Sequence, residues 1–323
     1  MKHVPVLLSE TIDSLQLKPG MNIVDCTLGD AGHSEAILEK ISPDGKLLGI
    51  DLDPEAVLRA KQFLYNFGDR AILVRSNFAN LQEIIAKNNF NPVHAIVMDL
   101  GWSTPQFEER GRGFSFLTDE PLDMRYGVGE MLKVQGEEST TAADIVNNYP
   151  EEELSKIFKQ LGEENLSKEI AEAIVDYRKR RVSKDATRHD SAESSKKIET
   201  TGELVEIILE TYRQKLKSDK EVPWVGGLHP ATKVFQALRI ETNHELENLK
   251  KVLPQAVDAL AAGGRLAVIT FHSLEDRIVK QYFQSIANKK IRLVNKKPII
   301  STDAELKENA RARSAKLRVV EKL

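Results

Sequence analysis

The sequence predicts a doubly wound α/β domain that is interrupted by an inserted, mainly helical domain. Three observations favour this fold class: short apolar runs alternate with helical patterns over the first hundred residues, the strand pattern stops between Asp99 and Arg265, and one apolar run then resumes it. Strands that alternate with helices form a parallel sheet with helices on both faces. A chain of 323 residues, 41% hydrophobic and 29% charged, is long enough to bury such a core.

The elements of the first half follow in order. The predicted strands are "NIVDCTL", "KLLGIDLD", "AILVRS" and "VHAIVMDLG", and the predicted helices are "SEAILEKI", "PEAVLRAKQFLYNF" and "LQEIIAKN". Ser34 is placed to cap the first of these helices, Pro54 suits the first turn of the second, and Gly68 closes that second helix.

The second half begins with a loop rich in Gly, Pro and aromatic residues. Amphipathic helical stretches follow at "EEELSKIFKQLG", "SKEIAEAIVDYRKRR" and "TGELVEIILETYRQKL". A helix from about Pro230, a "GG" turn and the strand "RLAVITF" resume the sheet pattern, and "IRLVN" and "KLRVV" are short strands for its edge. An ordinary crossover between two parallel strands needs about a dozen residues and usually consists of one helix. The sequence therefore predicts a sheet domain over residues 1–104 and 228–323, with a substrate-recognition domain inserted over residues 105–227.

Polar and aromatic residues fall at the ends of the predicted strands, where an open parallel sheet binds its ligand. The turn from Gly29 to Gly32 follows the first strand, and Asp51 ends the second strand 22 residues after Gly29. Phe78 lies just after the third strand, and Asp99 ends the fourth. These positions predict a ligand site along one edge of the sheet.

Asp51 is predicted to bind a ribose, because a carboxylate about 20 residues beyond such a turn can accept both hydroxyl protons. Asp53 is the rival, but it precedes Pro54 as a helix cap would. Phe78 can lie against an adenine or pack against the sheet. For His33 the backbone N–H at the start of a helix matters more than the ring.

The turn favours S-adenosylmethionine over a nicotinamide dinucleotide. A pyrophosphate usually requires the fuller G-x-G-x-x-G pattern. Here Asp30 lies between the two glycines and would repel a pyrophosphate, whereas a sulfonium cofactor carries a positive centre and no phosphate.

Charge and composition restrict the remaining classes. The net charge is −3, yet the segment from Ser285 to the C-terminus has eleven Lys or Arg against four Asp or Glu, and "RKRR" begins at Arg178. Such runs are either solvated or contact phosphates. The single cysteine, Cys26, lies in an apolar strand and is expected in the core. The sequence has no zinc-type Cys/His spacing, no membrane-length apolar run and no signal-peptide pattern at its start, so no metal is expected and a cytoplasmic protein is predicted.

Eight segments together resemble one family. They are "HVPVLLSETID", "DCTLGDAGHSEAIL", "GIDLDPEA", "DLGWSTPQFEERGRGFSF", "PLDMR", "HPATKVFQALRIETNHEL", "GGRLAVITFHSLEDRIVK" and "NARARSAKLRVV". They closely resemble the S-adenosylmethionine-dependent methyltransferases that modify the exocyclic amine of a cytidine in bacterial small-subunit ribosomal RNA (the RsmH, or MraW, family). The resemblance implies a class I methyltransferase fold with a helical insertion, 16S ribosomal RNA of the decoding region as substrate, and a possible homodimer.

The resemblance also implies a set of cofactor contacts. Beside Gly29, these are Ala31, Gly32, His33, Asp51, Phe78, Asp99 and Gln106. The chain departs from the family where its turn reads Asp30-Ala31-Gly32 and where Trp102 stands in "GWST". Trp102 would narrow the pocket or stack on a base. The polar stretch from Val182 to Lys197 is longer than is usual in the family.

The chemistry at a cytidine amine requires placement more than a strong base, because the amine proton becomes acidic once the methyl group has arrived. Asp99, or a carbonyl of "DLGWS", is predicted to accept the amine hydrogens; contact with the cofactor is the favoured alternative for Asp99. His272 and Ser273 follow the neighbouring strand and are the other catalytic candidates. The segment from Ser273 to Asp276 also reads as a capping box.

Reaching a base means unstacking it, and aromatic residues beside cations offset that cost. Phe114 and Phe116, with Arg112 and Arg125, supply this combination in one loop, although either phenylalanine could instead anchor the loop to the core. Trp102, Arg239 and Asn243 complete the predicted substrate-binding set. A methyltransferase acting on a DNA or protein amine, and a non-catalytic RNA- or nicotinamide-binding module, are the alternative functions.

Overall fold

The computed structural model divides the chain into two compact units. The first comprises Met1–Ser103 and Leu246–Leu323, and the second comprises Thr104–Glu245. The structure describes residues 5–101, 111–126, 140–179, 196–217, 222, 224 and 227–323.

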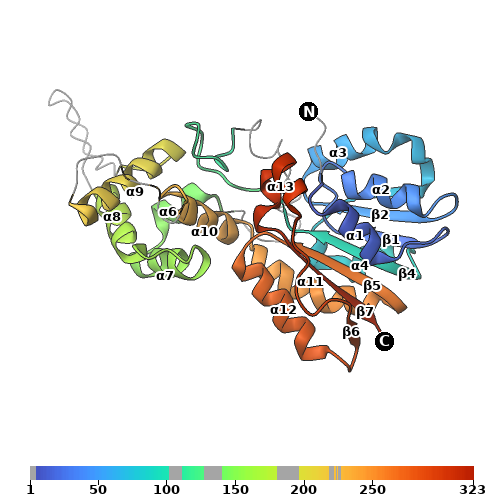
Figure 1. The fold of residues 1–323 in the computed structure, drawn as a ribbon. Helices are drawn as coiled ribbons and strands as arrows, with labels where there is room; N and C mark the ends of the chain where they lie inside the picture. Colours follow the sequence, from blue (N-terminus) through green and yellow to red (C-terminus); the bar gives the residue numbers. More distant parts are fainter. Residues whose placement is uncertain are drawn as a thin grey trace. The chain divides into compact units, whose positions relative to one another are not determined.

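The first unit contains one sheet and the helices that cover it (Figure 1). Its strands are β1 (Asn22–Asp25), β2 (Lys46–Asp51), β3 (Ala71–Arg75), β4 (Val93–Asp99), β5 (Leu260–Thr270), β6 (Ile291–Leu293) and β7 (Lys316–Lys322). Its helices are α1 (Leu8–Leu15), α2 (Gly32–Lys40), α3 (Pro54–Phe63), α4 (Leu81–Lys87), α11 (Glu245–Ala259), α12 (Ser273–Ile286) and α13 (Asp303–Glu308), with short 3-10 turns η1 (Tyr65–Arg70), η2 (Phe78–Asn80) and η4 (Ala310–Ser314).

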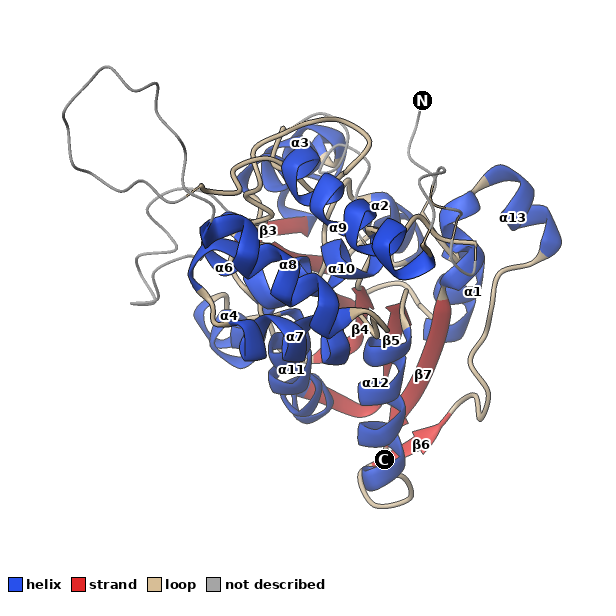
Figure 2. Cartoon of the chain, turned by 90° about the vertical axis from the view of Figure 1, so that its left-hand side faces the viewer, coloured by secondary structure: helices blue, strands red, loops and turns tan. Residues whose placement is uncertain are grey.

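The sheet has the strand order β3-β2-β1-β4-β5-β7-β6. The first five strands in this order pair in parallel, so their carboxyl ends share one edge. β7 pairs antiparallel with both β5 and β6, and Lys316 at its start lies opposite Thr270 at the end of β5. Figure 2 shows β4, β5 and β7 side by side with β6 beyond them. The predicted doubly wound α/β fold is therefore confirmed, including the two short strands at its edge.

Period-two alternation along the strands creates two cores. In β1, Val24 packs in the core that contains α4, α11 and α12, while Ile23 packs in the core that contains α1, α2 and α3. In β4, Ile96 and Val97 divide in the same way. Strands buried on both faces appear in the sequence as nearly continuous apolar runs, because helices cover both sides. Cys26 is buried in the first of these cores, as predicted.

The second unit is helical in its described part. Its helices are α6 (Ala142–Asn148), α7 (Glu151–Leu161), α8 (Ser167–Lys179), α9 (Thr201–Leu216) and α10 (Thr232–Thr242). α7 packs against α8 and α10, and α8 packs against α9. Their apolar faces share one core with residues of the loop that precedes them, including Leu122 and Met124.

The helix expected from about Pro230 is two helices. α10 ends at Thr242, and His244, with a left-handed φ of 50°, separates it from α11. Val234 and Leu238 of α10 are buried in the core of the second unit, so this unit extends to Glu245 and not to residue 227. The sequence boundary differs because amphipathic periodicity shows that a helix has an apolar face but not which core that face enters.

The predicted signals around α3 are confirmed at its start and differ at its end. Pro54 is the first residue of α3, and the Asp53 side chain caps it by accepting from the N–H of Glu55 over 3.0 Å. The helix ends at Phe63, and Gly68 lies instead in η1 with φ 56°. Asp53 therefore has the capping role that the sequence favoured.

Candidate active site

The turn that follows β1 has a left-handed backbone. Gly29 has φ 48° and Ala31 has φ 62°, and the N–H of Ala31 donates to the carbonyl of Leu28 over 2.7 Å. α2 begins at the next residue, Gly32, where a Cβ would lie 2.3 Å from the side chain of Pro5. Gly32 is thus required by the close approach of the N-terminal segment, whereas Gly29 is required by its positive φ.

Asp51 is hydrogen-bonded to this turn. Its Oδ2 accepts from the N–H of Gly29 and its Oδ1 accepts from the N–H of Asp53, each over 2.8 Å. Burial raises the pKa of the Asp51 carboxyl from 3.8 to about 6, and the two backbone hydrogen bonds oppose that rise only in part. Each oxygen retains a lone pair for another donor. The structure thus places the predicted ribose-binding carboxylate beside the predicted glycine turn.

This raised pKa predicts a pH dependence of ligand binding. An ionised carboxylate can accept hydrogen bonds from both ribose hydroxyls, whereas a protonated carboxyl carries a hydrogen on one of the two oxygens. We therefore expect the affinity for an adenosine-bearing ligand to rise with pH through about 6 and to level off above about 7. A single site of this pKa predicts roughly tenfold weaker binding at about pH 5 than at about pH 8. Calorimetric titration of the wild type across this range measures it.

The Asp51→Asn variant is the control for that titration. It cannot ionise, so it should bind weakly at every pH and should flatten the profile. A wild-type affinity that stays constant between about pH 5 and pH 8 would show that Asp51 is not the titrating group.

Asp25 and Thr27, which the sequence analysis did not single out, connect the turn to β4. The buried Asp25 carboxylate accepts from the N–H of Thr27 over 3.0 Å and from the hydroxyl of Ser34 over 2.6 Å. The Thr27 hydroxyl in turn accepts from the N–H of Asp99 over 2.7 Å. Ser34 is therefore not the helix cap that the sequence predicted; it lies inside α2, with Ala31 at the cap position. An acidic residue within the apolar run "NIVDCTL" is the sequence signal that could have identified Asp25.

Asp99 lies at the end of β4 between two neighbours. Its Oδ1 accepts from the N–H of Gly101 over 3.0 Å, and its Oδ2 lies 3.6 Å from Nδ1 of the buried His33. Burial lowers the pKa of the His33 imidazole, so this ring is neutral near pH 7. A Cβ at Gly101 would lie 2.7 Å from the ring of Phe271 and 2.9 Å from the Asp99 carboxylate. Any side chain at Gly101 would therefore displace one of these two groups.

Phe78 is half-buried at the start of η2. Its ring packs against the core that contains α4 and α11, so the sheet-packing alternative accounts for part of its surface. The preceding residue, Asn77, accepts from the N–H of Ala79 over 2.9 Å and fixes the turn after β3. Contact with an adenine stays a prediction for the exposed remainder of the ring.

His272 and Ser273 lie where β5 leads into α12. The helix begins at Ser273, and His272 is its cap residue. The Glu275 carboxylate accepts from the N–H of Phe271 over 2.8 Å and from the N–H of His272 over 3.3 Å. The predicted capping box thus exists one residue earlier than expected, and the Ser273 side chain lines a pocket at this end of the sheet.

Asp30 forms an ion pair with Arg59 of α3, which weakens the argument from repulsion. The Arg59 guanidinium donates to Asp30 Oδ1 over 2.9 Å. Because a cation already neutralises Asp30, repulsion of a pyrophosphate by this residue alone does not decide the cofactor class.

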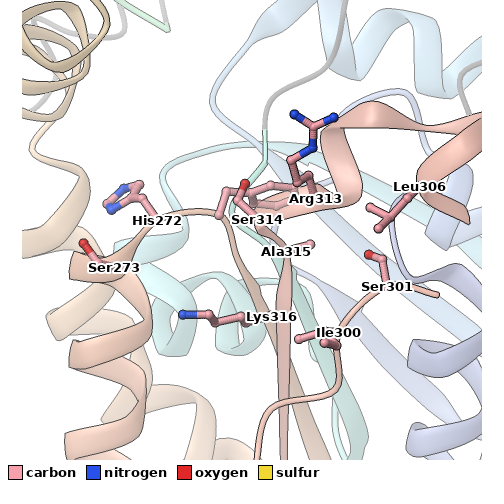
Figure 3. A pocket seen from close by; sticks show the side chains of 10 residues that line it. His272, Ser273, Ile300, Ser301, Leu306, Arg313, Ser314, Ala315 and Lys316 are labelled. Atoms are coloured by element: carbon pink, nitrogen blue, oxygen red, sulfur yellow. The ribbon is translucent and has the colours of Figure 1, made fainter. Parts of the chain in front are cut away.

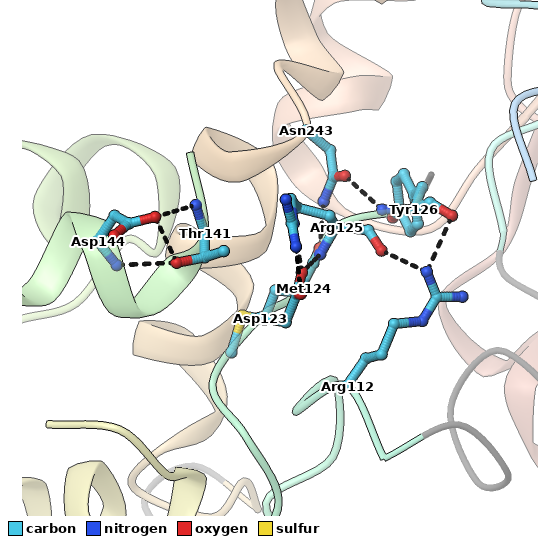
Figure 4. Close-up of polar contacts among 8 residues, drawn as sticks. All are labelled: Arg112, Asp123, Met124, Arg125, Tyr126, Thr141, Asp144 and Asn243. Carbon is cyan, nitrogen blue, oxygen red and sulfur yellow. Dashed lines mark hydrogen bonds and ion pairs between the residues drawn. The ribbon is translucent and has the colours of Figure 1, made fainter. Parts of the chain in front are cut away.

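Several predicted substrate-binding residues of the second unit form its own polar framework (Figure 4). Arg112 donates to the carbonyls of Arg125 and Tyr126 over 2.9 and 3.3 Å. Asn243 accepts from the N–H of Tyr126 over 2.9 Å and donates to the carbonyl of Met124 over 2.7 Å. These contacts hold the loop over residues 111–126 in place and do not by themselves bind a substrate.

The remaining members of that set divide between core and surface. Phe114 is buried and stacks on Tyr126 at 5.5 Å between centroids, so the core-anchoring alternative is correct for it and stacking on a base is not open to it. Phe116 is partly buried and stacks on His229 at 4.8 Å. The Arg125 guanidinium donates to both carboxylate oxygens of Asp123, over 2.7 and 2.6 Å.

Arg239 is buried in an ion pair, so its expected role changes from substrate binding to stability. Its guanidinium donates to both oxygens of Glu245, over 2.7 and 2.9 Å, and Tyr126 also donates to Glu245 over 2.8 Å. Removing one partner of a buried ion pair leaves the other charge buried without a partner, which destabilises the fold. We expect Glu245→Gln to lower the free energy of unfolding of the helical unit by about 3 kcal/mol in urea titration.

An exposed ion pair is the matched control. Glu206 contacts Arg213 over 2.7 Å on the surface of α9. Glu206→Gln should leave the urea midpoint unchanged, because solvent screens exposed pairs. Equal urea midpoints for the two variants would show that the buried pair contributes no more to the free energy of unfolding than the exposed pair does.

Gln106, Trp102 and residues 182–195 of the polar stretch lie outside the described residues, and their predicted roles stay predictions. Among the helices that the structure does describe, none has the length and apolarity needed to span a membrane.

The fold and its carboxyl edge define the class of the protein. A dinucleotide-binding sheet is mostly parallel and has the strand order 3-2-1-4-5-6, whereas here an antiparallel strand, β7, lies between β5 and β6. The edge presents a glycine turn without the full pyrophosphate pattern, followed by the carboxylates of Asp51 and Asp99. This is the Rossmann-like fold of class I methyltransferases that use S-adenosylmethionine.

Comparison with known proteins identifies the family. The model of the MraW methylase family matches residues 1–323. Curated relatives named Ribosomal RNA small subunit methyltransferase H include one from Dehalococcoides mccartyi, 43% identical over 99% of this chain and 86% of the relative. Others are from Clostridium botulinum, 42% identical over 100% of this chain and 99% of the relative, and from Clostridioides difficile, 40% identical over 99% of both. The chain belongs to the MraW methylase family.

Proposed function

We propose that this protein transfers the methyl group of S-adenosylmethionine to the exocyclic amine of a cytidine in the decoding region of 16S ribosomal RNA. One observation carries the proposal: the family match spans residues 1–323, and relatives that are 40 to 43% identical over nearly the whole chain are named for small-subunit ribosomal RNA methylation. The substrate is therefore RNA of the small ribosomal subunit.

The residues at the carboxyl edge fit this donor. Asp25, Asp51 and Asp99 place three carboxylates beside the turn; burial is the main cause of the raised pKa values of Asp25 and Asp51, and repulsion by Asp99 and by Asp25, respectively, adds to it. Such an acidic edge suits a sulfonium cation better than a pyrophosphate. When bound, S-adenosylmethionine supplies a methyl group activated by its positive sulfur.

Each residue has a separate task in holding that donor. Asp51 accepts from the ribose hydroxyls while it also accepts from the N–H of Gly29. The exposed part of the half-buried Phe78 ring borders the adenine. Gly29, Ala31 and Gly32 bring the backbone of the turn close to the methionine portion, together with the N-terminus of α2, which begins at Gly32 and includes His33.

Placement accounts for most of the catalytic demand at the amine. The amine nitrogen attacks the methyl carbon as the bond from carbon to sulfur breaks, and the nitrogen then loses a proton to water or to a nearby acceptor. Asp99 is held by the N–H of Gly101 and contacts the donor, and either its carboxylate or a carbonyl of residues 99–101 accepts the amine hydrogens. His272, next along the sheet edge, acts as a donor to the substrate.

RNA approaches through two basic regions and one aromatic region. Phe116 of the helical unit keeps a partly exposed ring for stacking on an unpaired base. The exposed Lys296 and Lys297 and the segment "RARSAKLR" supply contacts to phosphates. The protein acts in the cytoplasm, where its ribosomal substrate is found, and a homodimer stays a prediction that analytical ultracentrifugation tests.

Mass spectrometry of small-subunit RNA nucleosides tests the function. Cells that lack this protein should lose one N4-methylated cytidine species, and a plasmid with the wild-type gene should restore it. Unchanged methylation of cytidine in the deleted strain would overturn the proposal.

A further inference from the structure

A pocket of about 430 Å³ lies beside the predicted cofactor edge, within the first unit (Figure 3). Two of its walls come from distant parts of the sequence. His272 and Ser273 line it from the start of α12, while Arg313 lines it from η4 and Lys316 from the start of β7. None of the roles assigned above uses this pocket as a whole.

The pocket continues the row of predicted ligand residues along the sheet. Asp51 ends β2, Asp99 ends β4, and Lys316 lies opposite Thr270 at the end of β5. Neighbouring strands lie about 4.8 Å apart, so the pocket begins roughly one to two strand spacings beyond Asp99. A polymer bound with one unit at Asp99 would place an adjoining unit over β5 and β7.

The charged side chains that line the pocket are both cationic. Arg313 makes no ion pair with any residue in the described part of the chain, and its guanidinium is exposed. Lys316 lies 3.6 Å from Asp276, but that carboxylate is already bound by Arg318 over 2.7 Å. The two carboxylates nearby, Asp276 and Glu275, are thus engaged by Arg318 and by backbone N–H groups. An anion is the ligand that this charge balance favours.

The rest of the lining is mainly apolar. Ile300 is 63% exposed, and Phe271 and Leu306 are partly buried beside it. An exposed aliphatic residue and an aromatic ring next to cations match a flat base that is attached to a phosphate.

The pocket is separate from the position of the reacting amine. Neither Asp99 nor Gly101 lines it, whereas Phe271 borders both places: its ring lines the pocket, and a Cβ at Gly101 would come within 2.7 Å of that ring.

We propose that this pocket binds a nucleotide adjacent to the target cytidine, with its phosphate on Arg313 and Lys316 and its base against Ile300, Leu306 and Phe271. The inference rests on the proposed function, which supplies an RNA strand at Asp99. Seating the neighbour unstacks the strand and fixes the target base in register. Site selection then depends on the nucleotide beside the target as well as on the target itself.

Kinetics with unmethylated small subunits, prepared from cells that lack the protein, test the proposal. The full-length variants are Arg313→Gln and Lys316→Gln; neither should unfold the chain, because Arg313 is exposed and Arg318 still binds Asp276 when Lys316 is replaced. Lys251→Gln is the matched control, since Lys251 is an exposed cation of α11 outside the pocket. Calorimetry with S-adenosylmethionine measures cofactor affinity in parallel.

We expect each pocket variant to raise the KM for subunits about fivefold or more and to leave the Kd for S-adenosylmethionine unchanged. The slope of log KM against log salt should fall by about 0.7 for each phosphate that the variant no longer neutralises. The control should match the wild type. A benzophenone side chain introduced at Ile300 should crosslink to RNA at a nucleotide next to the methylated cytidine.

The failures can be told apart. If the wild type is active and both variants have its KM for subunits, this inference alone is overturned. A crosslink from position 300 to a ribosomal protein instead of RNA would have the same consequence. A wild type that transfers no methyl group to small subunits would overturn the proposed function and, with it, the inference.

Discussion

The Asp51→Ala variant should bind S-adenosylmethionine at least about 100-fold more weakly than the wild type while it keeps its fold. Hydrogen bonds to a charged group contribute about 1.5 to 3 kcal/mol each, and a ribose loses two of them in this variant. The variant also removes the acceptor that the N–H of Gly29 uses, so the turn loses a hydrogen bond of 2.8 Å. Isothermal calorimetry at about pH 8, where the wild-type carboxyl is ionised, measures the effect.

The fold should survive this change because the ionised Asp51 carboxylate is unfavourable where it is buried. Its pKa is raised to about 6, which means that the folded state binds its proton more tightly than the unfolded chain does. The protonated Asp51 carboxyl therefore contributes to stability below pH 3.8, and this contribution is lost as the pH rises to about 6. At neutral pH, replacing Asp51 by Ala removes the cost of burying an ionised carboxylate.

Asp53→Ala is the matched control for Asp51→Ala. Asp53 is two residues away and caps α3 through the N–H of Glu55. Loss of this cap should cost about 1 kcal/mol of stability but should leave cofactor affinity near that of the wild type. If Asp53→Ala weakened binding as much as Asp51→Ala, the ribose assignment would move to Asp53.

The sheet could be predicted from the sequence because strands that are buried on both faces are apolar at nearly every position. Runs such as "VHAIVMDLG" are apolar at consecutive positions, since Ile96 and Val97 enter different cores. The order of the strands in the sheet could be predicted from the sequence only in part. The antiparallel insertion of β7 between β5 and β6 depends on pairing between segments separated by about fifty residues, which no local pattern encodes.

The cofactor edge was predictable where its residues follow strands, as Asp51 and Asp99 do. Asp25 and Thr27 were missed because they act on the turn through hydrogen bonds that depend on how β1 and β4 pair. Gly32 was interpreted as a ligand-facing glycine, yet its missing side chain makes room for Pro5, a residue 27 positions earlier.

The substrate residues of the inserted unit were the least predictable part. Phenylalanine and arginine in one loop are typical of RNA contacts and also of a core with its supporting ion pairs. Phe114 and Arg239 proved to be buried, and nothing in their local sequence distinguishes that outcome from exposure. Only the pairing of Arg239 with Glu245, six residues later and across a helix break, decides it.

Replacing Asp99 should have the second largest effect, a loss of about 100-fold or more in kcat/KM for small-subunit RNA. This carboxylate lies at the one point where the glycine turn, β4 and Gly101 meet: its backbone N–H donates to Thr27, its Oδ1 accepts from Gly101, and its Oδ2 lies 3.6 Å from His33. Loss of a hydrogen bond from the donor to this charged group costs about 1.5 to 3 kcal/mol of binding and lowers the rate accordingly when S-adenosylmethionine is subsaturating. Methyl transfer from labelled S-adenosylmethionine to unmethylated subunits measures the loss.

The variant also separates the two roles that Asp99 can have. If Asp99 mainly contacts the cofactor, Asp99→Ala raises the Kd for S-adenosylmethionine and saturating cofactor restores most of kcat; we expect this result, because the fixed contacts of Asp99 run to the turn that holds the donor. If it mainly accepts the amine hydrogens, kcat falls at saturation while the Kd is unchanged. Asp258→Ala, which removes an exposed carboxylate bound to Lys290 over 3.0 Å, should match the wild type in both measurements. Wild-type kinetics in Asp99→Ala would contradict both roles and would leave the carbonyls of residues 99–101 as the acceptors at this edge.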